Sequence, residues 1–299
     1  MVNIAVVGIG RWGKNLVREL NALCTVTTCC SNGSAANVEW LKENYPSIKH
    51  TFSYDDVLKD RSIDAVVIAT PIETHAALAR RALEAGKHVF VEKPLATSYE
   101  EADALNALAR KRGRTLFVGH VFLHHPAWKQ LKIIVQKEGV RQANMEWLKW
   151  GTFGEELVWN LLVHDVALAI DLFGDVKKVE VKYTQQWVTS TDVLAVTLHF
   201  PGDRRCAIHV NRVSSAKKKV MTVKTGENAY LWEDDKLFKA IGESLSEVYR
   251  AEESALTAEC KDFLKVIEMD ESSETDGAFG AEVVKTAEKI RNEIKDLVQ

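Results

Sequence analysis

Residues 3–13 read NIAVVGIGRWG and place Gly8, Gly10 and Gly13 directly after an apolar run. The apolar run predicts a buried strand, and the following segment, 14–23, predicts a helix. In that context Gly8 permits a tight turn, Gly10 lets the backbone approach a pyrophosphate, and Gly13 allows close helix-to-strand packing. The alternative is a glycine-rich turn without a ligand, but the strand, loop and helix order favours a dinucleotide site. Its predicted residues are Gly8, Ile9, Gly10, Arg11, Trp12 and Gly13.

The first 120 residues alternate short β-branched runs with amphipathic stretches, a pattern typical of strand-helix units on a parallel sheet. Because the strands are almost continuously apolar, we expect helices on both faces of the sheet. We therefore predict an α/β fold whose residues 1–120 form a doubly wound, dinucleotide-binding Rossmann domain. The predicted strands are 3–7, 25–30, 65–69, 88–91 and 115–118, and the clearest helices are 75–85 and 99–111.

The pattern changes from about residue 121, and we predict a second domain over 121–299. Longer strands at 179–187, 193–200, 205–213 and 218–224 follow one another with short turns, which indicates an antiparallel meander. With the helices before and after them, these strands predict an α+β domain that has an open, mainly antiparallel sheet. We assign substrate binding, catalysis and oligomerisation to it, and we allow that the last helix packs back on the first domain.

The end of the second predicted strand bears on the choice between NAD and NADP. An NAD site places an acidic residue there, about twenty residues after the glycines, to bond the ribose 2′-hydroxyl. Here the strand ends in Ser31 and Asn32, with no carboxylate. Small neutral side chains do not repel a 2′-phosphate, although no Arg or Lys stands beside them. We expect NAD or NADP and favour NADP, with Ser31 and Asn32 as cofactor-binding residues.

Two further turns follow predicted strands, at the edge where open α/β sheets bind ligands. One holds Thr70 and Pro71, and the other holds Glu92 and Lys93 before a proline. We predict that all four contact the cofactor. A lysine fixed beside a cationic nicotinamide ring has its pKa lowered, so Lys93 is a candidate proton acceptor. The alternative is an ordinary surface lysine at a helix start.

Asn160 and His164 lie four residues apart in an otherwise apolar stretch, which predicts a buried helix with both on one face. The histidine could exchange a proton with a substrate hydroxyl while Asn160 orients the substrate. The alternative is a satisfied core histidine with Asp165 nearby. From the residues alone, both interpretations stay open for Lys93 and for Asn160 with His164.

Bulk properties exclude several classes of function. A net charge of -3 gives no excess of cationic side chains for nucleic acid. The chain begins directly with a strand pattern and has no apolar run of membrane-spanning length, so we expect a cytoplasmic protein without membrane association. The five cysteines and the clustered histidines lack metal-ligand spacing, and we predict no metal site.

These motifs together resemble the Gfo/Idh/MocA family of oxidoreductases. The resemblance rests on GIGRWG at 8–13, ATPIETHAALARRALEAGKHVFVEKPLA at 69–96, VGHVFLHHPAW at 118–128 and WNLLVHDVALAID at 159–171. It covers essentially the whole chain, more strongly in the first 174 residues.

The resemblance implies roles for several residues. Lys93 matches the lysine of the family's EKP motif, which touches nicotinamide ribose and substrate, and His164 matches the acid/base histidine. Asn160 departs from the aspartate common at its position, which leaves the division of labour between Lys93 and His164 open. His75 is assigned to the cofactor site. The resemblance implies Lys93, Asn160 and His164 as the catalytic residues. The implied substrate-binding residues are Lys93, His120, Asn160 and His164.

The resemblance is strongest to members that act on nucleotide sugars. It implies reversible conversion of a secondary hydroxyl to a ketone on a sugar or nucleotide sugar, by a homodimer or homotetramer. Two alternatives stay open: an NAD-dependent glycosidase of the same fold, and a non-catalytic NAD(P)-binding sensor.

Overall fold

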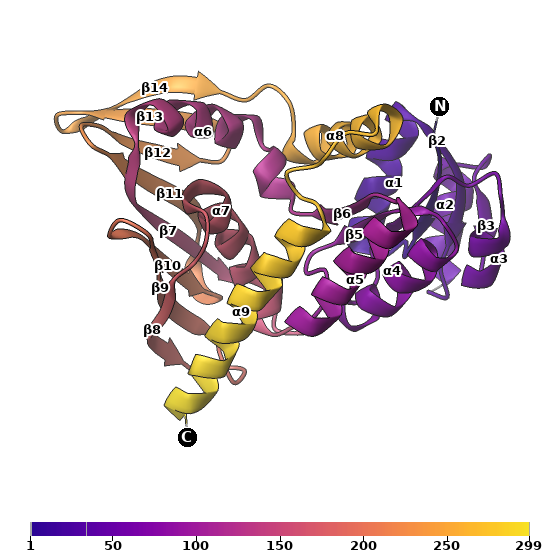
Figure 1. Ribbon diagram of the computed structural model, residues 1–299, viewed down its shortest axis with the longest axis horizontal. Helices are drawn as coiled ribbons and strands as arrows, with labels where there is room; N and C mark the ends of the chain where they lie inside the picture. Colours follow the sequence, from indigo (N-terminus) through magenta and orange to yellow (C-terminus); the bar gives the residue numbers. More distant parts are fainter. Residues whose placement is uncertain (1, 34, 299) are drawn as a thin grey trace. The chain divides into compact units, whose positions relative to one another are not determined.

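The computed structural model describes residues 2–33 and 35–298 and divides into two compact units. The first unit comprises the chain up to His120 together with Leu256–Val284, and the second comprises Val121–Ala255 together with the chain from Lys285 onward. None of the described helices is both long and apolar enough to span a bilayer. Figure 1 shows the order of the elements along the chain.

The first unit is built on a six-stranded parallel sheet in the order β3-β2-β1-β4-β5-β6, which confirms the predicted doubly wound sheet. Its strands are β1 (Asn3–Val7), β2 (Thr25–Cys30), β3 (Lys49–Thr51), β4 (Ala65–Ile68), β5 (His88–Glu92) and β6 (Leu116–Gly119). The helices between them are α1 (Arg11–Leu23), α2 (Ala35–Asn44), α3 (Tyr54–Lys59), α4 (His75–Glu84) and α5 (Tyr99–Arg112), with a 3-10 turn η1 (Ile72–Thr74).

Helix α8 (Ala255–Met269) completes the core of this unit, although it lies late in the sequence. Phe263 packs against Phe90 and Phe117 of strands β5 and β6, with ring centroids 5.4 Å from each. The two strand phenylalanines stack on each other at 5.2 Å. Burial of three aromatic rings accounts for the return of the chain to the first unit, because each ring removes a large apolar area from water.

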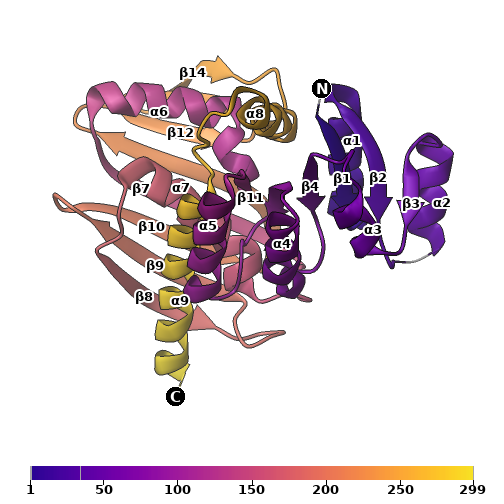
Figure 2. The ribbon, with the colours of Figure 1, turned by 45° about the vertical axis from the view of Figure 1, so that its right-hand side comes forward.

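The second unit is built on an eight-stranded sheet in the order β14-β13-β12-β11-β7-β10-β9-β8. Helices α6 and α7 contact its strands, and Figure 2 shows the sheet with these helices. The strands are β7 (Val140–Trp150), β8 (Lys178–Gln185), β9 (Val193–Phe200), β10 (Arg204–Asn211), β11 (Val213–Thr225), β12 (Ala229–Glu233), β13 (Lys236–Ile241) and β14 (Ser244–Arg250). The remaining elements are η2 (Val121–His124), α6 (Pro126–Glu138), η3 (Val158–Leu162), α7 (Val163–Phe173) and α9 (Gly277–Val298), which begins in the first unit.

The mainly antiparallel character of this sheet is confirmed, but the predicted four-strand meander is wrong at one step. Strands β8, β9 and β10 form a meander, whereas β10 and β11 lie on opposite sides of β7. The β7–β10 pair is parallel. The insertion of β7 could not be read from the sequence, because local alternation sets the face of a strand and not its neighbour.

The predicted division into 1–120 and 121–299 differs from the observed units in one segment. Residues 256–284 cluster with the first unit, so the first part of α9 and the whole of its preceding loop belong there as well. The outermost predicted positions, 1 and 299, lie outside the described residues.

Candidate active site

The glycine loop between β1 and α1 has the geometry of a dinucleotide cradle. Gly8 has a φ of +92°, and a Cβ atom there would lie 2.4 Å from the Ala69 carbonyl oxygen. A Cβ on Gly13 would lie 1.9 Å from the Gly8 oxygen, whereas a Cβ on Gly10 would meet nothing within 4 Å. Gly8 and Gly13 are thus required by the fold itself, and Gly10 opens on free space at a helix N-terminus that can take a phosphate.

The loop after β2 presents small polar groups. The Ser31 side chain accepts a hydrogen bond from the Gly33 amide at 3.0 Å, while Asn32 is exposed. Since the Ser31 hydroxyl keeps its own proton, it remains a donor. The described residues of this loop carry no carboxylate, in keeping with the sequence interpretation.

His75, predicted as a cofactor-binding residue, is buried between the turns after β4 and β5. Its ring is 1% exposed, with Nδ1 2.8 Å from the Pro94 carbonyl oxygen and Nε2 2.9 Å from the Thr70 carbonyl oxygen. Burial lowers the pKa of His75, and the contacts with the two carbonyl oxygens oppose that effect. The imidazole therefore lies between the turns after β4 and β5 and, when neutral, donates a hydrogen bond to one of the two carbonyl oxygens, which supports a positioning role.

Glu92 links the glycine loop to the turn after β5. Its carboxylate accepts a hydrogen bond from the Trp12 indole and packs against Gly119, where a Cβ atom would lie 3.1 Å from the Glu92 carboxyl carbon. Burial raises the pKa of Glu92 to about 7, although Trp12 and the neighbouring Lys93 act in the opposite direction. The side chain is thus enclosed beneath the loop.

Glu259 on α8 is a second buried carboxyl group in the first unit, and the sequence analysis did not identify it. Neither of its oxygens has a hydrogen-bond partner among the described residues. Burial, followed by the charge of Glu92, raises its pKa well above the ordinary value. A glutamate in an amphipathic helix gives no signal of burial in the sequence, so only the packing of α8 reveals this pair.

Lys93 follows Glu92 at the carboxyl end of β5, and its side chain is half-buried. The Thr70–Pro71 turn follows the neighbouring strand β4 at the same edge, and the glycine loop follows β1, the strand next to β4. The fold therefore brings three of the predicted cofactor-binding segments to one edge of the parallel sheet.

In the second unit, Asn160 and His164 lie on two kinds of helix. Asn160 belongs to the π-helical turn η3, and His164 to the first turn of α7. The prediction of one regular helix is therefore wrong at Asn160, because a π turn changes the angular spacing that places residues four apart on one face. Both side chains are half-buried, whereas Trp159, Leu161 and Val163 beside them are buried. This partial exposure argues against a fully enclosed core histidine.

Aromatic rings surround His164. The Phe122 ring lies 5.0 Å and the Trp147 ring 5.6 Å from the imidazole, centroid to centroid. Both rings also contact the ammonium group of Lys219. The Lys219 Nζ atom lies 3.5 Å from the centroid of the Trp147 ring and 4.3 Å from that of the Phe122 ring. Lys219 in turn forms an ion pair with Asp165 at 2.8 Å. Neither charged residue was predicted as part of the site, although Asp165 follows His164 directly and a lysine triplet contains Lys219.

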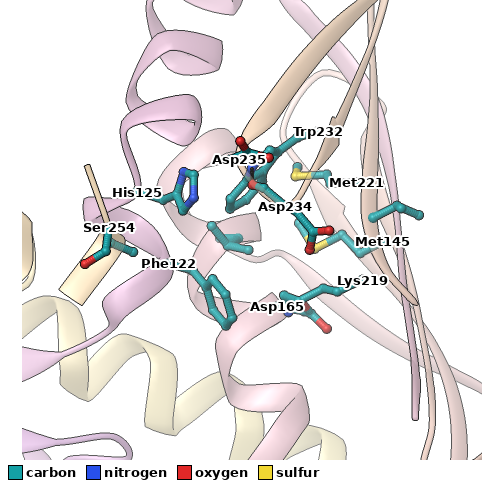
Figure 3. A pocket seen from close by; sticks show the side chains of 13 residues that line it. Phe122, His125, Met145, Asp165, Lys219, Met221, Trp232, Asp234, Asp235 and Ser254 are labelled. Carbon is teal, nitrogen blue, oxygen red and sulfur yellow. Dashed lines mark hydrogen bonds and ion pairs between the residues drawn. The ribbon is translucent and has the colours of Figure 1, made fainter. Parts of the chain in front are cut away.

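A cavity of about 340 Å³ lies next to these residues, within the second unit. Figure 3 shows Asp165 and Lys219 at one end and His125, Trp232 and Asp235 at the other. This volume is within the range of small-molecule sites, and the mixture of apolar walls with a few polar groups is typical of them. Its lining residues are Phe122, His125, Met145, Asp165, Leu168, Lys219, Val220, Met221, Trp232, Asp234, Asp235, Ser254 and Ala255.

His120, predicted to contact substrate, is buried at the end of β6. Its ring packs edge-on against Phe279, with centroids 5.7 Å apart. This geometry supports a packing role in the first unit rather than an open contact surface.

Two family models of known proteins match the chain, one in each of its two parts. Residues 2–120 match the family model for the Gfo/Idh/MocA oxidoreductase family, NAD-binding Rossmann fold. Residues 120–231 match the model for the Gfo/Idh/MocA C-terminal domain.

Relatives with similar sequences are oxidoreductases. The chain is 30% identical over 215 residues to the uncharacterized oxidoreductase YdgJ of Escherichia coli, an alignment that covers 66% of this chain and 62% of that protein. It is 29% identical over 175 residues to a UDP-N-acetylglucosamine 3-dehydrogenase of Acidithiobacillus ferrooxidans, covering 56% and 53% of the two chains. The chain thus aligns with less than two thirds of the length of these curated relatives.

A solved structure is similar over nearly the full length. It is that of UDP-N-acetylglucosamine 3-dehydrogenase GnnA from Acidithiobacillus ferrooxidans, with a TM-score of 0.92, 25% identity and 99% of each chain covered. Levoglucosan dehydrogenase, whose structure holds NADH and levoglucosan, has a TM-score of 0.90 at 18% identity, and that likeness concerns the fold.

Proposed function

The chain belongs to the Gfo/Idh/MocA family of oxidoreductases, and we propose that it interconverts a secondary hydroxyl and a ketone on a sugar or nucleotide sugar. NAD or NADP is its cofactor. The observation that carries the proposal is the meeting of the glycine loop, the Thr70–Pro71 turn and Lys93 at one edge of the parallel sheet. A nicotinamide cofactor accepts or supplies the hydride when bound.

The first unit supplies the cofactor-binding residues. The open space at Gly10 and the first amides of α1 suit a pyrophosphate. Trp12 is held by Glu92, and the turns after β4 and β5 are held by His75. These contacts fix the loop geometry before a ligand binds, which reduces the ordering cost of binding.

Lys93 and His164 are the two candidates for the group that exchanges a proton with the substrate during hydride transfer. In oxidation, one of them takes the hydroxyl proton, and in reduction it returns the proton to the ketone oxygen. Asn160 can orient the substrate through its amide, which both donates and accepts hydrogen bonds. Because the Asn160 amide does not take up a proton near neutral pH, we assign the proton transfer to Lys93 or His164.

We favour NADP over NAD, since Ser31 and Asn32 place no negative charge after β2. We also propose that the chain forms a homodimer or homotetramer. Exposed apolar side chains on strands of the second sheet, among them Trp150, Tyr183 and Ile241, support this proposal.

The direct test is native mass spectrometry of the full chain with NAD(H) and NADP(H), which also reports the oligomeric state. Absorbance of the reduced nicotinamide is then followed with UDP-N-acetylglucosamine and other nucleotide sugars. Binding of a dinucleotide and turnover of one of these substrates are expected. Failure to bind any dinucleotide would overturn the proposal.

A further inference from the structure

The cavity of the second unit contains an ion pair that the proposed chemistry does not use. Asp165 and Lys219 both line it, with the Lys219 Nζ atom 2.8 Å from Asp165 Oδ1. The aspartate side chain is 3% exposed and the lysine side chain 22% exposed. The carboxylate is therefore enclosed, while part of the lysine side chain is accessible and lines the cavity.

The surroundings of Lys219 fix its position and leave it donor capacity. A lysine ammonium group has three N–H donors, and Asp165 is the acceptor found for it among the described residues. The ring faces of Trp147 and Phe122 make cation–π contacts with the ammonium group. A donor that is held in place but not saturated is suited to recognise an oxygen atom of a ligand.

Asp165 has a carboxylate oxygen whose hydrogen-bonding capacity is not used by the residues that the structure describes. Its Oδ2 atom is buried and has no hydrogen-bond partner among the described residues. Burial raises the pKa of Asp165 and lowers that of Lys219, and the attraction between the two opposes both shifts. The aspartate thus serves as the anchor and counterion of Lys219.

The charges of the cavity limit the kind of ligand it can take. Asp165 neutralises Lys219, and the other charged lining residues are Asp234 and Asp235, in the turn between β12 and β13. His125 adds no positive charge near neutral pH, since burial lowers its pKa. Arg250, outside the lining, pairs with Asp235 at 3.4 Å. The charge left on the lining is that of Asp234, which opposes a phosphate or a carboxylate. An uncharged, oxygen-rich group fits it better.

We propose that Lys219, anchored by Asp165, determines substrate specificity by donating a hydrogen bond to an uncharged oxygen of a sugar held in this cavity. The acceptor is a hydroxyl or an amide carbonyl. This inference rests on the proposed function and narrows its substrate class to compounds whose sugar portion here carries no anionic group.

The test compares Lys219→Met with Lys218→Met. The two lysines are neighbours on β11, but Lys218 pairs with Glu146 at 2.8 Å and does not line the cavity. Binding of N-acetylglucosamine to the dinucleotide-loaded full chain is measured by saturation-transfer NMR, with glucose 6-phosphate as the anionic probe. We expect Lys219→Met to weaken N-acetylglucosamine binding about tenfold and Lys218→Met to leave it unchanged.

Three results would overturn the inference: equal binding by the two variants, stronger binding of glucose 6-phosphate, or no binding of N-acetylglucosamine to the unaltered protein. If Lys219→Met does not fold, the double variant Asp165→Asn/Lys219→Met removes both charges together and must show the same loss. Melting temperature and dinucleotide affinity serve as folding controls.

The same data separate this inference from the proposed function. Lysine-dependent sugar binding without turnover of any sugar or nucleotide sugar would overturn the proposed activity and support the cavity assignment. If Lys219→Met left both kcat and KM unchanged, that result would support the proposed activity and overturn the cavity assignment.

Discussion

The Asp192 carboxylate pairs with the guanidinium group of Arg212 in the interior of the second unit, with Nε 3.0 Å from Oδ1. The two side chains are 0% and 2% exposed. Arg212 also donates to the backbone oxygens of Thr152 and Glu155, and so it connects the loop after β7 to the loop before β9.

Replacement of Arg212 by Met should therefore destabilise the second unit strongly. Removing one partner of a buried ion pair leaves the other charge uncompensated and costs about 3–5 kcal/mol. Arg205→Met, at an exposed position of the preceding strand β10, serves as the control. Urea unfolding of both variants measures the difference, and equal midpoints would contradict the assigned role.

The pH dependence of stability should include a contribution from Asp192. Burial alone raises its pKa, but hydrogen bonds from Thr189, Trp187 and Val188 hold the pKa of Asp192 well below its usual range. A lowered carboxyl pKa stabilises the fold above the unfolded value, near about 4. That stability is lost as the pH falls further. Asp192→Asn should be less stable near neutral pH and show a shallower acid limb in unfolding experiments.

The Glu92 and Glu259 pair should have the opposite dependence. A raised carboxyl pKa favours folding at low pH, and the advantage disappears as the pH rises from about 4.3 through the folded value. Glu259→Gln should therefore gain about 1–3 kcal/mol over the natural chain at pH 8, and much less at pH 5. The exposed Glu268→Gln on the same helix is the control. A gain that is the same at both pH values would show that the carboxyl charge is irrelevant.

Lys93→Met should lower kcat while leaving dinucleotide affinity nearly unchanged. Loss of a general acid or base costs about 100-fold or more in rate, whereas the pyrophosphate cradle of the glycine loop is untouched. Single-turnover kinetics and calorimetric titration with the preferred dinucleotide measure the two effects, with the exposed Lys111→Met as control. Turnover near that of the natural chain would transfer the proton-accepting role to His164.

Asn32→Asp should shift cofactor preference away from NADP. The new carboxylate after β2 repels a 2′-phosphate and can accept a hydrogen bond from a 2′-hydroxyl. We expect NADP affinity to fall about tenfold or more relative to NAD, which corresponds to roughly 1.4 kcal/mol. Asn44→Asp, exposed at the end of α2, controls for added charge. An unchanged ratio of NADP to NAD affinity would mean that the 2′ group of the ribose does not bind near Asn32.

The sequence was sufficient to predict the parallel sheet and the edge at which the glycine loop, Thr70 and Lys93 meet, because both depend on local signals. Gly8 and Gly13 have local steric roles, and buried strands such as β4 are apolar along their whole length. The residues placed after these strands, Thr70 and Lys93 among them, follow directly from the strand ends.

Features that depend on distant packing could not be predicted in this way. Glu259 and Lys219 occupy positions that, in sequence, are typical of a helix surface and a strand edge. Their burial results from the packing of α8 on Phe90 and from the rings of Trp147 and Phe122. The π turn at Asn160 is equally invisible, since Val158–Leu162 has the composition of an ordinary helix.

The chain passes from one compact unit to the other after His120, after Ala255 and again after Val284. Neither unit is therefore a contiguous gene segment. Recombination that exchanged only residues 1–120 would bring in a new parallel sheet but not the helix α8 that evolved with it. The new sheet would then have to pack against the original α8 and its Phe263. Chimeras that exchange residues 1–120 together with residues 256–284 should accordingly express better than those that exchange residues 1–120 alone.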